Sequence, residues 1–174
     1  MFNEENTVEQ MVIDALSGTG SPWTFISADD LPREDSAVFV ESIVRDALIR
    51  LNPEIAKSPD RADEVLYKLR AIALSVRNSG LVRANEEFAE WLRGEKSMPF
   101  GERGEHVSVN LIDFKVSANN QYVVTNQWVY PTKQGGKRLD VVLLINGLPV
   151  VIGEAKTPVR PASSRPASRR PCPS

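Results

Sequence analysis

The chain has 174 residues, of which 41% are hydrophobic and 25% are charged, the composition of one ordinary globular domain. A single cysteine and a single histidine exclude an internal disulfide framework, a Cys-based zinc cluster and any site that needs two imidazoles. The net charge of −2 conceals an asymmetry, because residues 1–60 carry 12 acids and 4 bases whereas residues 61–174 carry 11 acids and 17 bases. The basic second part favours a polyanionic partner, although ordinary surface charge explains it equally well.

Residues 1–94 have the hydrophobic periodicity of a mostly helical region. Helices are expected over Thr7–Leu16, Ser36–Leu51, about Arg61–Arg77 and Ala84–Leu92. The first ten residues are acidic and lack the pattern of a secretory signal. Since no apolar run is long enough for a membrane helix, we expect a cytoplasmic protein.

Residues 105–157 change to a period of two, which predicts a β-rich region. Strands are expected over Val107–Asp113 and Gln121–Tyr130, followed by a loop over 131–137. Two nearly continuous apolar runs, 139–145 and 148–155, flank Asn146-Gly147, which is a strong short-range signal for a β-hairpin. Apolar residues at adjacent positions predict strands that are covered on both faces. Helices on a sheet make the fold class α/β or α+β.

Residues 162–174 contain Ser, Arg, Pro, Ala and one Cys but no large aliphatic or aromatic residue. Such a segment cannot bury a core, so we expect one domain over 1–161 and a disordered tail over 162–174. Because the tail begins abruptly after a strong strand, we hypothesise that it is not native sequence. Intact-mass analysis beside the sequence of the natural gene tests this hypothesis.

Charged residues stand at the outer ends of the expected hairpin. Asp140 begins the first strand, while Glu154 and Lys156 end the second and, being two apart, share a face. Oxygen ligands suit Mg²⁺, which takes only one or two carboxylates from a protein. The lysine would orient a water or stabilise charge on a phosphate. Solvated strand-end charges would give the same pattern about as often, and Asp113-Phe114-Lys115 is a competing triplet.

The register of the hairpin decides whether the two acids can meet. A strict two-residue turn pairs residues whose numbers sum to 293, which places Asp140 and Glu154 on opposite faces. One bulge changes this sum by one and brings both acids to the same face. Pro149 has no N–H for the ladder, so we predict such an irregularity.

The run GKRLDVVLLINGLPVVIGEAK resembles the nuclease core of the N-terminal domain of the R subunit of type I restriction enzymes, within the PD-(D/E)xK nuclease superfamily. The segments LIDFKVSANNQYVVTNQ and NTVEQMVIDAL also resemble that domain, so the resemblance covers about residues 2–161. It implies a restriction-endonuclease-like mixed sheet and a Mg²⁺-dependent endonuclease that cleaves double-stranded DNA. It further implies that Asp140 and Glu154 bind the metal and that Lys156 is the catalytic lysine. Glu9 matches an acid on the first helix that assists the metal, and a first-turn glutamate favoured by the helix dipole is equally consistent.

The sequence also departs from that family. The family core continues into a helix with a Gln/Tyr motif and a further strand, so we expect a core truncated on its C-terminal side, which can be inactive as a fragment. The motif G-x-x-x-x-G-K-[ST] is absent, so ATP, which the full subunit needs, is not expected to bind here.

The implied partners are double-stranded DNA and the modification and specificity subunits of a restriction complex. Lys133, Lys137 and Arg138 are candidate DNA contacts. The alternative function is an inert nuclease-fold module that docks the R subunit onto the modification and specificity subunits. Metal binding at Asp140 and Glu154 discriminates between the two functions.

Overall fold

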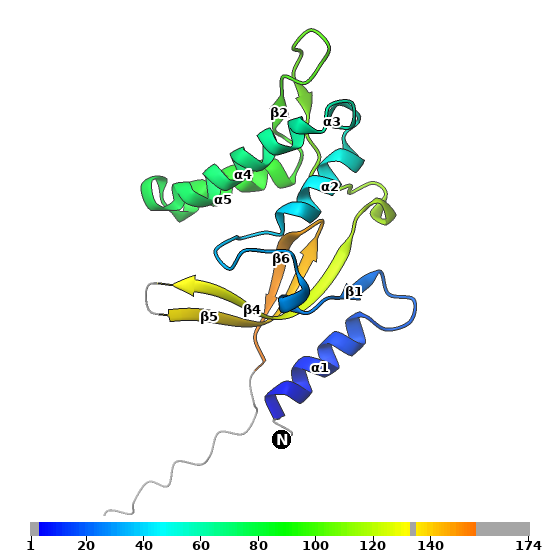
Figure 1. Cartoon of the computed structure of the whole chain (residues 1–174), viewed down its shortest axis with the longest axis vertical. Coiled ribbons are helices and arrows are strands. Elements are labelled where there is room, and N and C mark those ends of the chain that lie inside the picture. The colour runs from blue at the N-terminus through cyan, green and yellow to red at the C-terminus, as the bar shows by residue number, and fades with distance from the viewer. Residues whose placement is uncertain (1–3, 133–134, 156–174) are drawn as a thin grey trace, which may run out of the picture.

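The computed structural model describes residues 4–132 and 135–155 (Figure 1). The helices are α1 (Glu4–Leu16), α2 (Glu41–Leu51), α3 (Pro53–Ala56), α4 (Asp60–Ser79) and α5 (Leu81–Leu92), with short 3₁₀ helices η1 (Ala28–Asp30) and η2 (Ser117–Asn119). The strands are β1 (Trp23–Phe25), β2 (Ser97–Met98), β3 (Val107–Ser108), β4 (Tyr122–Thr132), β5 (Gly135–Ile145) and β6 (Leu148–Gly153). No described helix combines the length and the apolar character that crossing a membrane requires.

Four strands form a mixed sheet in the order β1-β4-β5-β6. Strand β1 is parallel to β4, while the β4–β5 and β5–β6 pairs are antiparallel. Strands β2 and β3 form a separate antiparallel ribbon. Figure 1 shows α2 to α5 gathered beyond one end of the sheet and α1 lying at the other end. The fold is therefore a mixed sheet flanked by helices, as the sequence predicts.

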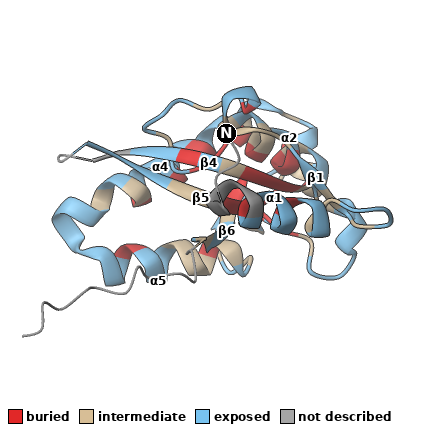
Figure 2. Cartoon of the chain, turned by 90° about the horizontal axis from the view of Figure 1, so that it is seen from below, coloured by how far each residue is buried: buried red, intermediate tan, exposed pale blue. Residues whose placement is uncertain are grey.

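Buried residues, red in Figure 2, lie in the middle of the sheet, and those of the central strand β5 belong to two separate core clusters. Val141 packs with Ile13 of α1, whereas its neighbour Val142 packs with Leu31 and Val40 on the opposite face. The prediction of a doubly covered strand is therefore confirmed for β5. It is wrong for the outer half of β6, where Ile152 is 61% exposed, because β6 is an edge strand of the sheet.

The helical region differs from the prediction at several places. Helix α3 was not expected, and α5 begins at Leu81, three residues before the expected Ala84. Strand β1 lies within it, since pairing with the distant β4 decides its conformation. Helix α1 begins at Glu4, three residues before the expected start. Helix α2 begins at Glu41 and not at Ser36. The backbone carbonyl groups of the segment before α2 accept hydrogen bonds from the Arg33 guanidinium, which holds this segment in a non-helical conformation.

Two predictions in the β-rich region are also wrong. Only Val107 and Ser108 of the first expected strand belong to a ladder. Beyond them, the Asn110 N–H donates to the Asn52 side chain and the Asp113 N–H to the Asn120 side chain, so side chains replace a partner strand. The expected loop over 131–137 is largely strand, because β4 and β5 remain paired to their ends and form a long arm (Figure 1).

The hairpin turn between β5 and β6 is held by hydrogen bonds of the Asn146 side chain. Asn146 has a positive φ of 50° and a fully buried side chain. Its Nδ2 donates to the Leu111 carbonyl and to Asn120 Oδ1, and its Oδ1 accepts from the Gln121 N–H and from Arg50 Nη2. This turn therefore joins the sheet to the loop before β4 and to α2, which fixes where the β5–β6 ladder begins.

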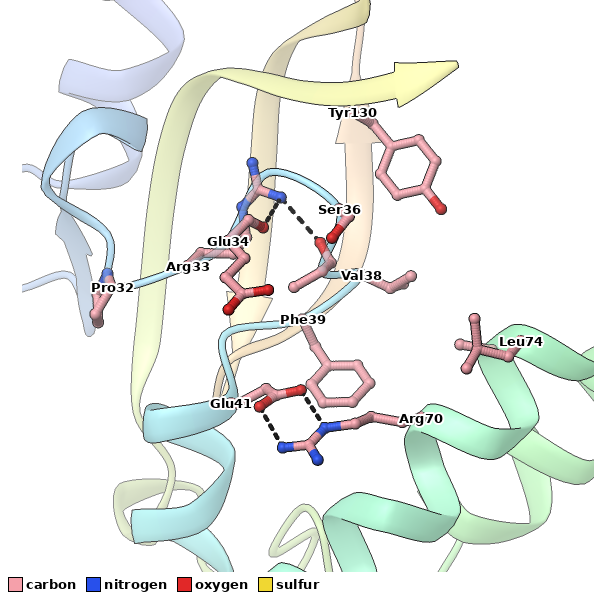
Figure 3. Close-up of a pocket in the computed structure, with 12 residues that line it drawn as sticks. Pro32, Arg33, Glu34, Ser36, Val38, Phe39, Glu41, Arg70, Leu74 and Tyr130 are labelled. Carbon is pink, nitrogen blue, oxygen red and sulfur yellow. Dashed lines mark hydrogen bonds and ion pairs between the residues drawn. The ribbon is translucent and has the colours of Figure 1, made fainter. Parts of the chain in front are cut away.

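Arg33 connects the arm to the segment that precedes α2 (Figure 3). Its Nη1 donates to the carbonyl groups of Glu34, Asp35 and Ala37, and its Nη2 donates to the Val129 carbonyl at 2.8 Å. The guanidinium carbon also lies 4.0 Å from the centre of the Trp128 ring. A planar group with five donors is required for this combination, which lysine cannot supply.

We therefore expect Arg33→Lys to lower the free energy of unfolding by about 2 kcal/mol, through lost charge-assisted hydrogen bonds and a lost cation–π contact. Urea denaturation measures the change. The control is Arg45→Lys, which alters an exposed ion pair with Asp63 and should leave the midpoint nearly unchanged. Equal midpoint shifts in both variants would contradict the structural role of Arg33.

Candidate functional site

The register of the β5–β6 ladder shifts by one residue near Pro149. Next to the turn, the pairs Ile145–Leu148 and Leu144–Pro149 have numbers that sum to 293. Farther out, the pairs Leu143–Val151, Val142–Ile152 and Val141–Gly153 have numbers that sum to 294. Val150 is the extra residue of this β-bulge. The irregularity predicted from Pro149 is therefore confirmed.

Extended one step beyond its last pair, Val141–Gly153, the shifted register would set Asp140 opposite Glu154, which follows the end of β6 at Gly153. Side chains directly opposite one another in an antiparallel pair have Cβ atoms roughly 5 Å apart. The Ala155 N–H donates to Asp140 Oδ2 at 2.7 Å, so the Asp140 side chain reaches the end of β6. Asp140 is half-buried and Glu154 is exposed. The two carboxylates thus share one end of the hairpin, with Glu154 open to solvent.

Glu9 is a buried acid on α1, with 6% of its surface exposed and its Oε1 atom without a hydrogen-bond partner. It lies one turn before Ile13, whose side chain packs against Val141, the neighbour of Asp140. Because α1 begins at Glu4, Glu9 lies in the second turn, and the first-turn helix-dipole explanation does not apply. A buried carboxylate oxygen without a partner is costly, which is a reason to expect a ligand.

The remaining predicted residues are not assembled with this pair in the described structure. Among residues 4–132 and 135–155, no three His, Cys, Asp or Glu side chains form a group that could hold a metal ion. Lys137 and Arg138 are exposed on β5, within the arm. Lys156 and Lys133 lie outside the described residues. The oxygen donors of Asp140 and Glu154 nevertheless suit Mg²⁺, which completes its coordination with water and substrate phosphate.

The competing triplet at Asp113 serves the local loop. Its carboxylate accepts hydrogen bonds from the N–H groups of Val116 and Lys115 at 2.9 Å and from Asn119 Nδ2 at 2.8 Å. These bonds, first that from Val116, hold the pKa of Asp113 below its usual value. The Asp113 carboxylate therefore stabilises a turn.

The lowered pKa of Asp113 predicts a pH dependence of stability. The ionised form is favoured by folding, so its contribution is complete above the unfolded-state pKa of about 3.9 and is lost as the pH falls through the lower folded-state pKa. We expect Asp113→Asn to be less stable than the wild type at neutral pH, and the difference to shrink below about pH 4. Urea denaturation across this range measures it. A difference that is constant with pH would contradict the prediction.

A separate cavity of about 630 Å³ lies between the 32–39 segment, α4 and Tyr130 (Figure 3). Arg33, which lines the cavity, donates hydrogen bonds to backbone carbonyl groups. Arg70, which also lines it, forms a bidentate ion pair with Glu41. Asp140, Glu154 and Glu9 do not line it. The cavity is therefore distinct from the candidate site and owes its shape to structural contacts.

Sequence reasoning missed the residue opposite Asp140 on β4. Gln127 has a φ of 51° in the middle of a strand. The sequence carries no signal for this conformation, because left-handed positions are normally marked by Gly or Asn. Arg33 was also missed, since its partners are backbone carbonyl groups that a sequence does not show.

A mixed sheet flanked by helices, with acids at the open end of its hairpin, is consistent with a nuclease-like α+β fold. The family model described as "Type I restriction enzyme R protein N terminus" matches residues 1–170, and the chain therefore belongs to this family. This family is the one that the sequence resemblance predicts.

Two relatives extend this result. The type I restriction enzyme HindI endonuclease subunit of Haemophilus influenzae is 33% identical over 172 residues, which is 92% of this chain and 15% of that protein. A protein of Methanocaldococcus jannaschii named "Putative type I restriction enzyme MjaIXP endonuclease subunit" is 26% identical over 162 residues, 90% of this chain and 15% of that protein. The chain thus spans about 15% of the length of these relatives. No solved structure matches it.

Proposed function

We propose that this domain binds Mg²⁺ between Asp140 and Glu154 and hydrolyses phosphodiester bonds of double-stranded DNA as the nuclease part of a type I restriction enzyme. The observation that supports the proposal is the register shift at Val150, which, extended one step beyond the last pair, would set Asp140 and Glu154 on the same face of the hairpin. The names of the relatives, both endonuclease subunits, support the same activity.

Each residue has a distinct part in the proposal. The Asp140 and Glu154 carboxylates would hold the ion. Glu9 does not form a group with them among the described residues, and its part would be to assist the site from α1. Mg²⁺ held by these residues would supply a Lewis acid for the phosphate and would lower the pKa of water bound to it. Lys156, two residues after Glu154, orients that water or stabilises the developing negative charge. Lys137 and Arg138 are exposed on the arm and bind the DNA backbone, together with Lys133.

Specificity is proposed to come from partner subunits of the restriction complex. The described part of the chain shows α2 to α5 packed with their apolar faces inward, and none carries the strongly basic face of a base-reading helix. The domain would then cut DNA that modification and specificity subunits present to it. The full protein would couple this cutting to ATP, for which this chain lacks a binding motif.

Calorimetric titration with Mn²⁺ and Mg²⁺ tests the proposal, with circular dichroism to show that each protein is folded. We expect saturable binding to the wild type and an affinity lower by about 100-fold or more in Glu154→Ala, which loses a direct ligand. Cleavage of plasmid DNA then follows in the same pair of proteins. A folded wild type that binds no metal contradicts the proposal and favours an inert module that docks onto partner subunits.

A further inference from the structure

Gln127 adopts an unusual backbone conformation beside the candidate site. Among the described residues, Gln127 and Asn146 are the two residues other than glycine that have a positive φ. Asn146 occupies a tight turn, where such a φ is expected. Gln127 instead lies inside the eleven-residue strand β4, where a left-handed conformation costs free energy and must be held by its surroundings.

This conformation interrupts the β4–β5 ladder at one pair. Asn126 pairs with Val141 and Trp128 pairs with Leu139, whereas Gln127 and Asp140, which lie between them, form no pair. The register is the same on both sides, so neither strand contains an extra residue. The interruption is therefore a local rotation of the chain, and its partner across the ladder is Asp140.

Beyond the rotation, the side chains of β4 lie on the opposite face of the sheet from the one that regular alternation predicts. Val124 packs toward α1, and regular alternation would place Trp128, four residues later, on the same face. Trp128 instead packs with Val123 and Val142 on the opposite face, where Arg33 covers its ring. Leu139, opposite Trp128, packs into the same cluster. The contacts of Trp128 therefore hold the rotation in place.

Because of this change of face, the Asp140 side chain does not take the direction that regular alternation along β5 would give it. Leu139 and Val142 pack on one face and Val141 on the other, so Asp140 lies where the alternation breaks. Its side chain extends toward the end of β6, where Oδ2 accepts the Ala155 N–H. This direction brings its carboxylate to the residue that follows Glu154.

We propose that Gln127 is a positioning residue whose left-handed backbone directs the Asp140 carboxylate toward Glu154. This inference rests on the proposed function, because it assigns the conformation of β4 to the metal site. It identifies the backbone of Gln127, and not its carboxamide, as the feature that matters. Glycine adopts a positive φ freely, whereas a β-branched residue resists it.

Two substitutions in the full chain separate these conformations. Gln127→Gly keeps the rotation, and Gln127→Val favours a regular strand that realigns Asp140. Gln121→Val, at the exposed residue before β4, controls for the change of side chain. The direction of Asp140 is followed by hydrogen exchange of the Ala155 amide without metal, and site function by titration with Mn²⁺.

We expect Gln127→Gly and Gln121→Val to retain the Ala155 exchange rate and the Mn²⁺ affinity of the wild type within about twofold. In Gln127→Val, exchange should be faster and the Mn²⁺ affinity lower, each by about tenfold or more, the effect of removing the support of a metal ligand. Unchanged exchange in Gln127→Val, or faster exchange in Gln127→Gly, would overturn the inference. The glycine variant decides the matter if the valine variant does not fold.

The two readouts also separate this inference from the proposed function. If the Ala155 amide responds as expected while the wild type binds no Mn²⁺, the positioning of Asp140 stands and the metal site fails. If Gln127→Val changes the exchange but binds Mn²⁺ as well as the wild type, the assignment of the rotation to the metal site is wrong.

Discussion

Asp140→Asn is expected to abolish stabilisation by Mn²⁺ without weakening the metal-free fold. The asparagine Oδ1 can still accept the Ala155 N–H, so the hydrogen bond at the end of β6 is retained. The negative charge of the proposed metal ligand is lost, so the variant should bind Mn²⁺ far more weakly. If Asp140 served only the fold, the opposite result would be seen. The variant would be less stable without metal, and Mn²⁺ would stabilise it as much as it stabilises the wild type.

The expected size follows from the linkage between binding and folding. At a free Mn²⁺ concentration 100 times its dissociation constant, binding stabilises the wild type by about 2.7 kcal/mol, whereas the variant should gain almost nothing. Thermal unfolding with chelator and with Mn²⁺ measures both proteins. Asp113→Asn is the matched control, because it alters the competing triplet and should keep the full response to Mn²⁺. A response in Asp140→Asn equal to that of the wild type would contradict the site.

Gly147→Ala is expected to be among the most destabilising single substitutions in the domain. Gly147 has a φ of 80°, and a Cβ atom there would lie 2.7 Å from the Val40 carbonyl oxygen and 2.9 Å from the Ile43 Cβ. The Gly147 carbonyl also accepts the Val40 N–H at 2.9 Å, which holds the turn against the start of α2. Backbone strain and overpacking together should cost about 2–4 kcal/mol.

Gly104→Ala separates these two causes. Gly104 has nearly the same φ, 81°, but no atom lies within 4 Å of the position of a Cβ atom. It should therefore show the backbone cost alone, about 1 kcal/mol. Urea denaturation of the two variants gives the contribution of the close approach as their difference. Equal losses would show that the turn can move away from α2.

The hairpin and its register could be predicted because their determinants are local. Asn146-Gly147 specifies the turn, the apolar runs specify the strands, and Pro149 indicates that the ladder cannot continue undisturbed. The main helices α2, α4 and α5 were also found from their periodicity, although their first residues were not. The one-residue shift in the register of the hairpin follows from these features alone.

Features that depend on distant residues could not be predicted. The conformation of the segment before α2 depends on hydrogen bonds from Arg33. The conformation of the chain after Ser108 depends on hydrogen bonds to the side chains of Asn52 and Asn120. The conformation of Gln127 depends on the packing of Trp128, which no local pattern records. Sequence reasoning therefore identified the acids of the candidate site but not the backbone that directs one of them.

Paramagnetic broadening by Mn²⁺ in amide NMR spectra tests the central claim most directly, because it locates the ion. We expect substoichiometric Mn²⁺ to broaden first the amides of Asp140, Glu154 and Ala155, followed by those around Glu9, and to spare the loop at Asp113. Broadening centred on other acidic residues, or none in a folded protein, would contradict a metal site at the end of this hairpin.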